Sequence, residues 1–222
     1  MERKLEPELM DDPVQALAYA DADFEVPHST FVKLFQDTFR YDDVHGYVLD
    51  LGCGPGDVSF RFCRAYPQCI VHGIDGAEAM LGCGRDILNN SPDIRDRVEL
   101  VYGILPGCEV PRKKYDIVIS NSLLHHLTEP QVLWNAVKLY ACHGASIFIM
   151  DLRRPATRDE AQALVDTYAV NEPEILRRDF YCSLLAAFEV DEIIAQLKDA
   201  KLHELQAKAI GDRHVTIAGY LV

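Results

Sequence analysis

Three features are missing from this chain of 222 residues, and each absence excludes a class of protein. No apolar run approaches the roughly 20 residues that a membrane-spanning helix needs. The seven cysteines form no CxxC pair, and their odd number fits reduced thiols better than a disulfide framework. Residues 1–8 do not show the basic and then apolar order of a secretion signal. We therefore expect a cytoplasmic protein with no membrane association.

Basic residues are also scarce. The chain has 22 Lys and Arg against 35 Asp and Glu, so its formal net charge is 22 − 35 = −13. Such a surface repels a phosphate backbone, which makes nucleic acid an unlikely partner, although a local basic patch could act against the global sign. The composition does not determine the oligomeric state, and a homodimer is one option.

The middle of the chain alternates short apolar runs with helical patterns. The apolar runs predict buried strands at 47–51, 69–74, 98–102, 115–120 and 145–150. Helical patterns lie between them at 57–66, from Gly76 or Ala77 to Asn89, and at 130–140. This alternation predicts an α/β fold with a doubly wound parallel sheet.

The two ends of the chain depart from this alternation. Residues 1–12 are polar and are expected to fray, and two helices follow at 13–22 and 31–39, the second capped by residues 28–30. Residues 157–187 predict two helices separated at Glu172-Pro173, which together are a candidate lid. A helix at 190–199 and an antiparallel pair at 203–210 and 215–222 complete a seven-stranded, mostly parallel sheet with its last strand reversed. The chain is then one domain, divided into a helical cap (1–44), a cofactor-binding core (45–152), a helical lid (153–188) and a terminal helix and hairpin (189–222).

A glycine turn follows the first predicted strand. Gly52, Gly54 and Gly56 allow left-handed backbone angles and let a ligand lie against bare main chain. The dinucleotide fingerprint GxGxxG would place its third glycine at position 57, which is Asp57. Asp50 and Asp57 stand on both sides of the turn, where they oppose a pyrophosphate and favour a positively charged ligand such as a sulfonium.

Asp75 ends the second predicted strand, 23 residues after Gly52. An acid at this place is suited to accept hydrogen bonds from the two ribose hydroxyls of an adenosine. The alternative is that Asp75 caps the following helix, and both roles are compatible.

Three runs now resemble a known family. Residues 48–56, 73–81 and 115–127 look like the motifs of the class I S-adenosylmethionine-dependent methyltransferases, in the right order and spacing. The resemblance covers residues 45–152 and implies a seven-stranded Rossmann-like fold with S-adenosyl-L-methionine as the cofactor. The family usually has Gly-Asp after the third strand, with the acid reaching the adenine amine, whereas this chain has Gly103-Ile104; backbone atoms at Ile104 or water would then serve the adenine.

The resemblance also implies which residues surround the cofactor. The glycine turn would hold its methionine part, Asp75 its ribose, Gly76 and Met80 its adenine, and Asn121 its ammonium. The full set is Tyr19, Asp50, Gly52, Cys53, Gly54, Asp75, Gly76, Met80, Gly103, Ile104, Asn121, Ser122 and His126.

Catalytic residues are harder to assign, because methyl transfer from a sulfonium mainly requires alignment of two reactants. The candidates are His125, His126 and Tyr19; in each case the alternative is a side chain that only packs or is solvated. Arg153, Arg154 and Tyr181 are candidates for binding an anionic substrate, and surface pairing of the arginines with Asp151 or Asp159 is the alternative. No metal-ligand spacing of cysteine and histidine is present, so we expect no metal.

The sequence therefore predicts an enzyme that transfers a methyl group from S-adenosylmethionine to a small-molecule acceptor by in-line displacement. One alternative is an RNA or protein methyltransferase. Another is a cofactor-binding module without turnover that regulates a partner. The identity of the acceptor, and whether its O, N, S or C atom is methylated, do not follow from the sequence.

Overall fold

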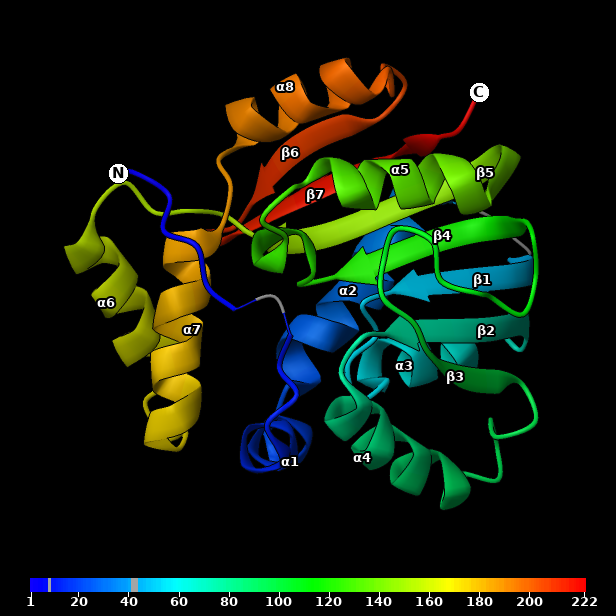
Figure 1. The fold of residues 1–222 in the computed structure, drawn as a ribbon, viewed down its shortest axis with the longest axis horizontal. Helices are drawn as coiled ribbons and strands as arrows, with labels where there is room; N and C mark the ends of the chain where they lie inside the picture. Colours follow the sequence, from blue (N-terminus) through cyan, green and yellow to red (C-terminus); the bar gives the residue numbers. More distant parts are fainter. Residues whose placement is uncertain (8, 41–43) are drawn as a thin grey trace.

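The computed structural model describes residues 1–7, 9–40 and 44–222, which form one sheet covered by helices on both faces (Figure 1). The sheet has seven strands in the order β3-β2-β1-β4-β5-β7-β6. The strands are β1 (His45–Leu51), β2 (Gln68–Asp75), β3 (Val98–Tyr102), β4 (Tyr115–Asn121), β5 (Ala141–Leu152), β6 (Gln206–Ile210) and β7 (His214–Tyr220). The helices are α1 (Pro13–Asp21), α2 (Glu25–Phe39), α3 (Asp57–Ala65), α4 (Glu78–Asn89), α5 (Gln131–Tyr140), α6 (Arg158–Tyr168), α7 (Glu174–Ala186) and α8 (Val190–Ala200), and η1 (Leu124–His126) is a single 3-10 turn.

The strand directions confirm the predicted sheet. The four pairs from β3 through β5 are parallel, whereas β7 pairs antiparallel with both β5 and β6. The strand order reverses between β1 and β4, and the crevice outside the carboxyl ends of strands at such a point is where open α/β sheets bind ligands. The predicted α/β class, with a reversed last strand, is therefore correct.

Each face of the sheet has its own apolar core. On one face α2, α3 and α4 pack against β1, β2 and β5 through an aromatic cluster in which the rings of Phe31 and Phe148 lie 5.0 Å apart, edge to face. On the other face α5 and α8 pack together, and the fully buried Trp134 donates its indole N–H to the Gln196 side chain at 3.1 Å. Buried aromatic rings of this size contribute strongly to stability, and the bonded indole carries no unsatisfied donor.

Helix α2 corrects the sequence prediction. It begins at Glu25 rather than at Phe31, so residues 28–30 lie inside the helix and do not cap it. Pro27 falls in the first turn, where a helix has no internal partner for the missing N–H, so it does not break the helix. Because Phe31 and Phe35 are fully buried against the sheet, most of α2 belongs to the core layer and only its first turn reaches toward the carboxyl ends of the strands.

The N-terminal segment gives a second correction, because the described residues among 1–12 are not frayed. The Lys4 N–H donates to the Leu185 carbonyl at 2.9 Å. The Arg3 guanidinium donates to the carbonyls of Ala186, His125 and Leu127 at 2.5–3.0 Å and stacks on the Phe188 ring at 3.8 Å. Polar residues that suggest a solvated tail therefore find buried partners more than 120 positions away along the chain.

Helices α6 and α7 lie beyond the carboxyl ends of the parallel strands, and α1 lies beside them at the same edge (Figure 1). α6 and α7 pack on each other through a small apolar cluster that includes Val165, Leu184 and Leu185. The helical insertion predicted at 157–187 is present, with its interruption at Pro173.

Candidate active site

A cavity of about 670 Å³ lies at the carboxyl ends of β1, β2 and β4. The glycine turn forms its floor, and α1, the first turn of α2, the end of α6 and one side of α7 contribute Tyr19, Val26, Tyr168, Leu176 and Phe180 to its walls. Its volume is typical of sites for small molecules and cofactors, which commonly measure 300–1,000 Å³.

The glycine turn has the conformation that its residues suggest. Gly52, Gly54 and Gly56 all have positive φ, at +70°, +55° and +86°. A Cβ at position 52 would lie 2.7 Å from the Leu123 side chain, whereas a Cβ at position 54 would meet no protein atom within 4 Å. Gly52 therefore packs closely against the chain, and Gly54 presents bare backbone to the cavity.

The Asp75 carboxylate connects this turn to the next helix. It accepts hydrogen bonds from the Gly54 N–H at 2.7 Å and from the Ala77 N–H at 2.8 Å. Burial raises its pKa, although these two N–H donors act in the opposite direction. Asp75 thus ties the glycine turn to Ala77, the residue before α4, while it lines the cavity. It does not cap the helix, because the first-turn N–H of Ala79 donates to Asp11 at 2.9 Å instead, and the ribose role stays a prediction.

Two buried acceptor atoms in the cavity wall have no hydrogen-bond partner among the residues that the structure describes: Asp50 Oδ1 and Asn121 Oδ1. The other Asp50 oxygen accepts from the Ser59 hydroxyl at 2.6 Å. Asp50 is 1% exposed, and burial raises its pKa to about 7. An unsatisfied buried acceptor costs about 1–3 kcal/mol, so both atoms are matched to a ligand that brings hydrogen-bond donors or positive charge.

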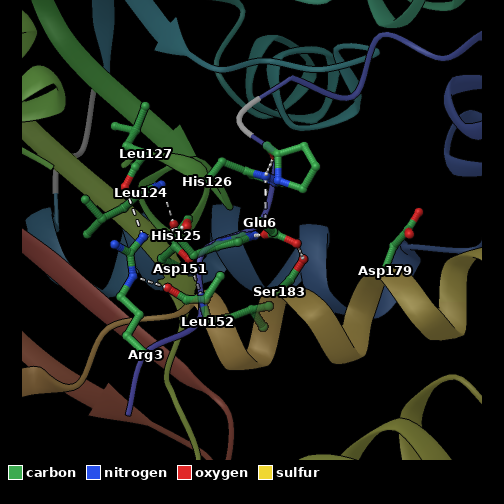
Figure 2. A network of polar contacts seen from close by, with 12 residues as sticks. Arg3, Glu6, Leu124, His125, His126, Leu127, Asp151, Leu152, Asp179 and Ser183 are labelled. Carbon is green, nitrogen blue, oxygen red and sulfur yellow. Dashed lines mark hydrogen bonds and ion pairs between the residues drawn. The ribbon is translucent and has the colours of Figure 1, made fainter. Parts of the chain in front are cut away.

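A polar network stands at the end of β4 (Figure 2). His125 is 2% exposed, and its Nδ1 lies 2.5 Å from Asp151 Oδ1, while Asp151 also accepts the Leu124 and Leu152 N–H groups. Nε2 of His125 lies 3.5 Å from Glu6 Oε1, and the same oxygen lies 3.3 Å from Nδ1 of His126. The carboxylates raise the pKa of His125 against the opposing effect of burial.

The other two catalytic candidates also line the cavity but have different electrostatics. Burial lowers the pKa of His126 to about 3, with the neighbouring His125 adding to the shift, so His126 is neutral at neutral pH. Burial raises the pKa of Tyr19 to about 12, and nearby carboxylates act in the same direction. The Tyr19 hydroxyl therefore keeps its proton and can donate a hydrogen bond to a ligand.

The structure brings together the residues predicted around the cofactor. Every one of them lines the cavity, as does His125: Tyr19, Asp50, Gly52, Cys53, Gly54, Asp75, Gly76, Met80, Gly103, Ile104, Asn121, Ser122 and His126. This placement is compatible with their predicted roles, which remain predictions.

The three candidates for an anionic substrate lie elsewhere and are corrected here. Arg154 is 7% exposed and donates to the Ala187 carbonyl and to Glu189 and Glu192. Its guanidinium charge is therefore neutralised by carboxylates of the protein itself. Arg153 donates to the Asp212 carbonyl, and Tyr181 packs against the α6–α7 cluster. None of the three belongs to the cavity lining, because Arg153 and Arg154 run beside Phe188 and Ala187, and Tyr181 packs toward α6.

Sequence reasoning missed two histidines in the cavity wall, His28 and His214. His28 Nδ1 lies 2.6 Å from Asp57, which also pairs with Arg61. Burial lowers the pKa of His214 to about 4. A signal for His214 exists in the sequence: a reversed last strand begins at the edge where the parallel strands end, and His214 pairs with Leu152 there.

Comparison with known proteins identifies the family. A methyltransferase-domain family model matches residues 48–164, just over half of the chain, so the chain belongs to this family. The plantazolicin methyltransferase BpumL, solved in complex with a monoazolic desmethylPZN analog and SAH, has the same fold. The match covers 94% of this chain and 90% of that chain, with a TM-score of 0.68 at 16% identity. The predicted relationship to the class I S-adenosylmethionine-dependent methyltransferases is confirmed.

Curated relatives match only the common core. Protein arginine N-methyltransferase 1 of Schizosaccharomyces pombe is 30% identical over 57% of this chain and 32% of its own length. Malonyl-[acyl-carrier protein] O-methyltransferase of Priestia megaterium is 26% identical over 47% of this chain and 35% of its own length. This chain therefore spans about a third of the length of these relatives, and their acceptors differ from one another.

Within the described ranges, none of the helices is both long and apolar enough to cross a bilayer.

Proposed function

We propose that this chain is an S-adenosylmethionine-dependent methyltransferase that transfers the methyl group to a small-molecule acceptor by in-line displacement. The observation that carries the proposal is the pair of unpartnered buried acceptors, Asp50 Oδ1 and Asn121 Oδ1, beside the open backbone of Gly54. S-adenosylmethionine carries an ammonium and a sulfonium and no phosphate, so it matches these acceptors where a dinucleotide would be repelled.

The cofactor, when bound, supplies a methyl group on a positively charged sulfur that is already a good leaving group. Asp50 and Asn121 would hold the ammonium, Gly52 to Gly54 would lie along the methionine part, and Asp75 would hold the ribose. The remaining task of the protein is to align the acceptor and exclude water, which the apolar wall around Phe24, Leu176 and Phe180 is suited to do.

The walls of the cavity also favour one class of acceptor. Among the described lining residues, seven are acidic (Asp23, Glu25, Asp50, Asp57, Asp75, Glu172 and Asp179) and two are arginines (Arg61 and Arg213). Arg61 is already paired with Asp57 and Glu25. This balance favours a neutral or cationic acceptor, such as an amine, alcohol or thiol, over an anionic one.

The cover over the cavity favours a small acceptor over a macromolecule. α1 and α7 lie across the edge of the sheet, so a folded protein or a duplex would have to displace them, whereas a flexible peptide end could enter. A relative that is a protein arginine methyltransferase keeps a protein acceptor as the second candidate. RNA is disfavoured by the net charge of −13, and a non-catalytic regulatory module is the remaining alternative.

The proposal is tested in two stages. S-adenosylhomocysteine should bind with one-to-one stoichiometry in calorimetry and raise the melting temperature, while NAD should do neither. Cell extract is then divided by size, and each fraction is incubated with the protein and methyl-labelled cofactor. Label in the low-molecular-weight fraction supports the proposal, and label only in protein or RNA favours the alternatives. If NAD binds and S-adenosylhomocysteine does not, the proposal is wrong.

A further inference from the structure

The Glu6, His125 and His126 side chains place three potential metal ligands beside the cavity (Figure 2). The ligand atoms are Glu6 Oε1, His125 Nε2 and His126 Nδ1, and all of them lie within 4.8 Å of one another. They come from distant parts of the chain, since Glu6 belongs to the N-terminal segment and the histidines to η1 at the end of β4.

The carboxylate oxygen at the centre of this group is unsatisfied. Glu6 Oε1 is buried without a hydrogen-bond partner in the described part of the chain, and its side chain is 8% exposed. Its neighbour Oε2 accepts from the Ser183 hydroxyl at 3.3 Å, so Oε1 is the atom that faces the two imidazoles. When His125 carries its single proton on Nδ1, toward Asp151, three lone pairs converge in this buried place. A metal ion that binds them takes the place of the second proton that the two carboxylates favour on His125.

The separations suit a tetrahedral ion. Zinc binds histidine nitrogen and carboxylate oxygen at about 2.0–2.2 Å, so two ligand atoms on one tetrahedron lie about 3.3–3.5 Å apart. Glu6 Oε1 lies 3.3 Å from the His126 nitrogen and 3.5 Å from the His125 nitrogen. The two histidine nitrogens lie within 4.8 Å of each other, so any adjustment on binding would be confined to this pair. His126 would carry its proton on Nε2, which gives up a long 3.4 Å contact from Nδ1 to the Pro7 carbonyl.

The surroundings have the features of a metal site that keeps one position open. Asp151 lies against Nδ1 of His125, which holds the ring with Nε2 turned toward Glu6. A carboxylate in this place orients an imidazole ligand and strengthens its binding to a metal. His125, His126 and Ser183 also line the cavity, so a fourth position on the ion would open toward the bound acceptor.

We propose that Glu6, His125 and His126 form a binding site for a divalent transition-metal ion of the zinc type. Two histidines and one carboxylate with an open fourth position are a recurrent arrangement for catalytic zinc. An ion here would bind the acceptor's oxygen, nitrogen or sulfur and lower its pKa, as metals do for bound water. The binding site stands on its own geometry, and only this catalytic role rests on the proposed function. The proposal revises the metal-free expectation from the sequence.

The test uses the full chain after treatment with a chelator. Co²⁺ is titrated under visible spectroscopy and Zn²⁺ under calorimetry, without cofactor. One ion should bind per chain, and Glu6→Gln and His126→Asn should each weaken binding at least tenfold. The exposed His203 gives the matched control, because His203→Asn removes an imidazole outside the group and should leave affinity unchanged. Glu6→Gln can keep the Ser183 contact, and circular dichroism verifies that each variant is folded.

X-ray absorption of the wild-type Zn²⁺ complex gives a measurement that needs no variant. Nitrogen and oxygen neighbours with imidazole scattering are expected, whereas sulfur neighbours would assign the ion to the free cysteines and overturn the proposal. Absence of saturable binding, or equal affinity in Glu6→Gln, His126→Asn and wild type, would overturn it too. Binding of S-adenosylhomocysteine is measured in parallel: if it persists without metal binding, only this inference fails, and if it is absent, the proposed function fails.

Discussion

The substitution Asp50→Asn separates the stability of the empty protein from its affinity for the cofactor. Burial raises the pKa of Asp50 to about 7 from its ordinary 3.8. A carboxyl group whose pKa is higher in the folded than in the unfolded state stabilises the fold at low pH. This contribution is full below about pH 4 and is lost as the pH rises through about 7. At 1.36 kcal/mol for each pH unit, the loss above pH 7 is about 4 kcal/mol.

Asparagine has no charge to bury, so the variant avoids this loss. It can keep the hydrogen bond from the Ser59 hydroxyl, but its amide N–H group replaces the unpartnered Oδ1 and costs about 1–3 kcal/mol. At pH 8 the empty variant should therefore be more stable than wild type by about 1–3 kcal/mol. For a chain of this size that corresponds to a melting temperature higher by about 3–10 °C. The pH dependence of stability between pH 4 and 8 should flatten.

Cofactor affinity should change in the opposite direction. Loss of the charge-assisted bond to the ammonium costs about 1.5–3 kcal/mol, or about ten- to a hundredfold in the dissociation constant at pH 8. In wild type, protonation of Asp50 should weaken binding about tenfold between pH 8 and pH 6, and the variant should lack this dependence. Calorimetry with S-adenosylhomocysteine and thermal melting over the same pH range measure both effects.

A matched control is Asp86→Asn, which removes an exposed carboxylate on α4. It should alter neither the pH profile of stability nor the affinity. The reasoning is refuted if Asp50→Asn keeps the wild-type affinity at pH 8, or if its melting temperature follows the same pH profile as wild type.

Three further substitutions test the remaining parts of the site. Gly54→Ala and Gly211→Ala each place a Cβ at a similar positive φ (+55° and +59°), with no protein atom within 4 Å of it, so both should lower the free energy of unfolding by about 1–2 kcal/mol. Only Gly54→Ala should weaken S-adenosylhomocysteine binding. Equal affinities of the two variants would show that Gly54 does not face the ligand. Asp75→Asn should lower the free energy of unfolding in urea by about 1–3 kcal/mol, because the new amide N–H group faces one of the two backbone N–H donors, from Gly54 or Ala77. It should also weaken S-adenosylhomocysteine binding. Unchanged affinity for this ligand would contradict the ribose role. Arg3→Gln should speed hydrogen exchange at the Lys4 amide, because three carbonyls lose a charged donor. Exchange as slow as in wild type would show that Arg3 does not hold the N-terminal segment in place.

The glycine turn and the strand ends around it could be predicted from the sequence, because the backbone angles and the strand pattern that they need depend on neighbouring residues. Positive φ at Gly52, Gly54 and Gly56 favours glycine, so the sequence marks the turn directly. Carboxyl ends of parallel strands meet at one edge of a sheet, which brings Asp75 and Asn121 beside that turn although 46 positions separate them. The predicted cofactor residues that follow β1 to β4 line the cavity for this reason, whereas Tyr19 reaches it from α1.

The remaining residues could not be placed from sequence because their partners are distant along the chain. Arg154 follows β5 directly, yet its charge pairs with α8, which sequence position alone does not reveal. The start of α2 was misplaced for a different reason: residues 28–30 are good capping residues, but they lie inside a helix that begins at Glu25.

The amino-acid sequence by itself determined the α/β class, the glycine turn and the acids around it, since strand runs and backbone angles are properties of neighbouring residues. Only the tertiary structure decided what covers the turn. Glu6 meets His125 and His126 across about 120 positions, and Arg3 anchors the segment that carries Glu6. Such contacts arise from packing of whole elements, which no local pattern encodes.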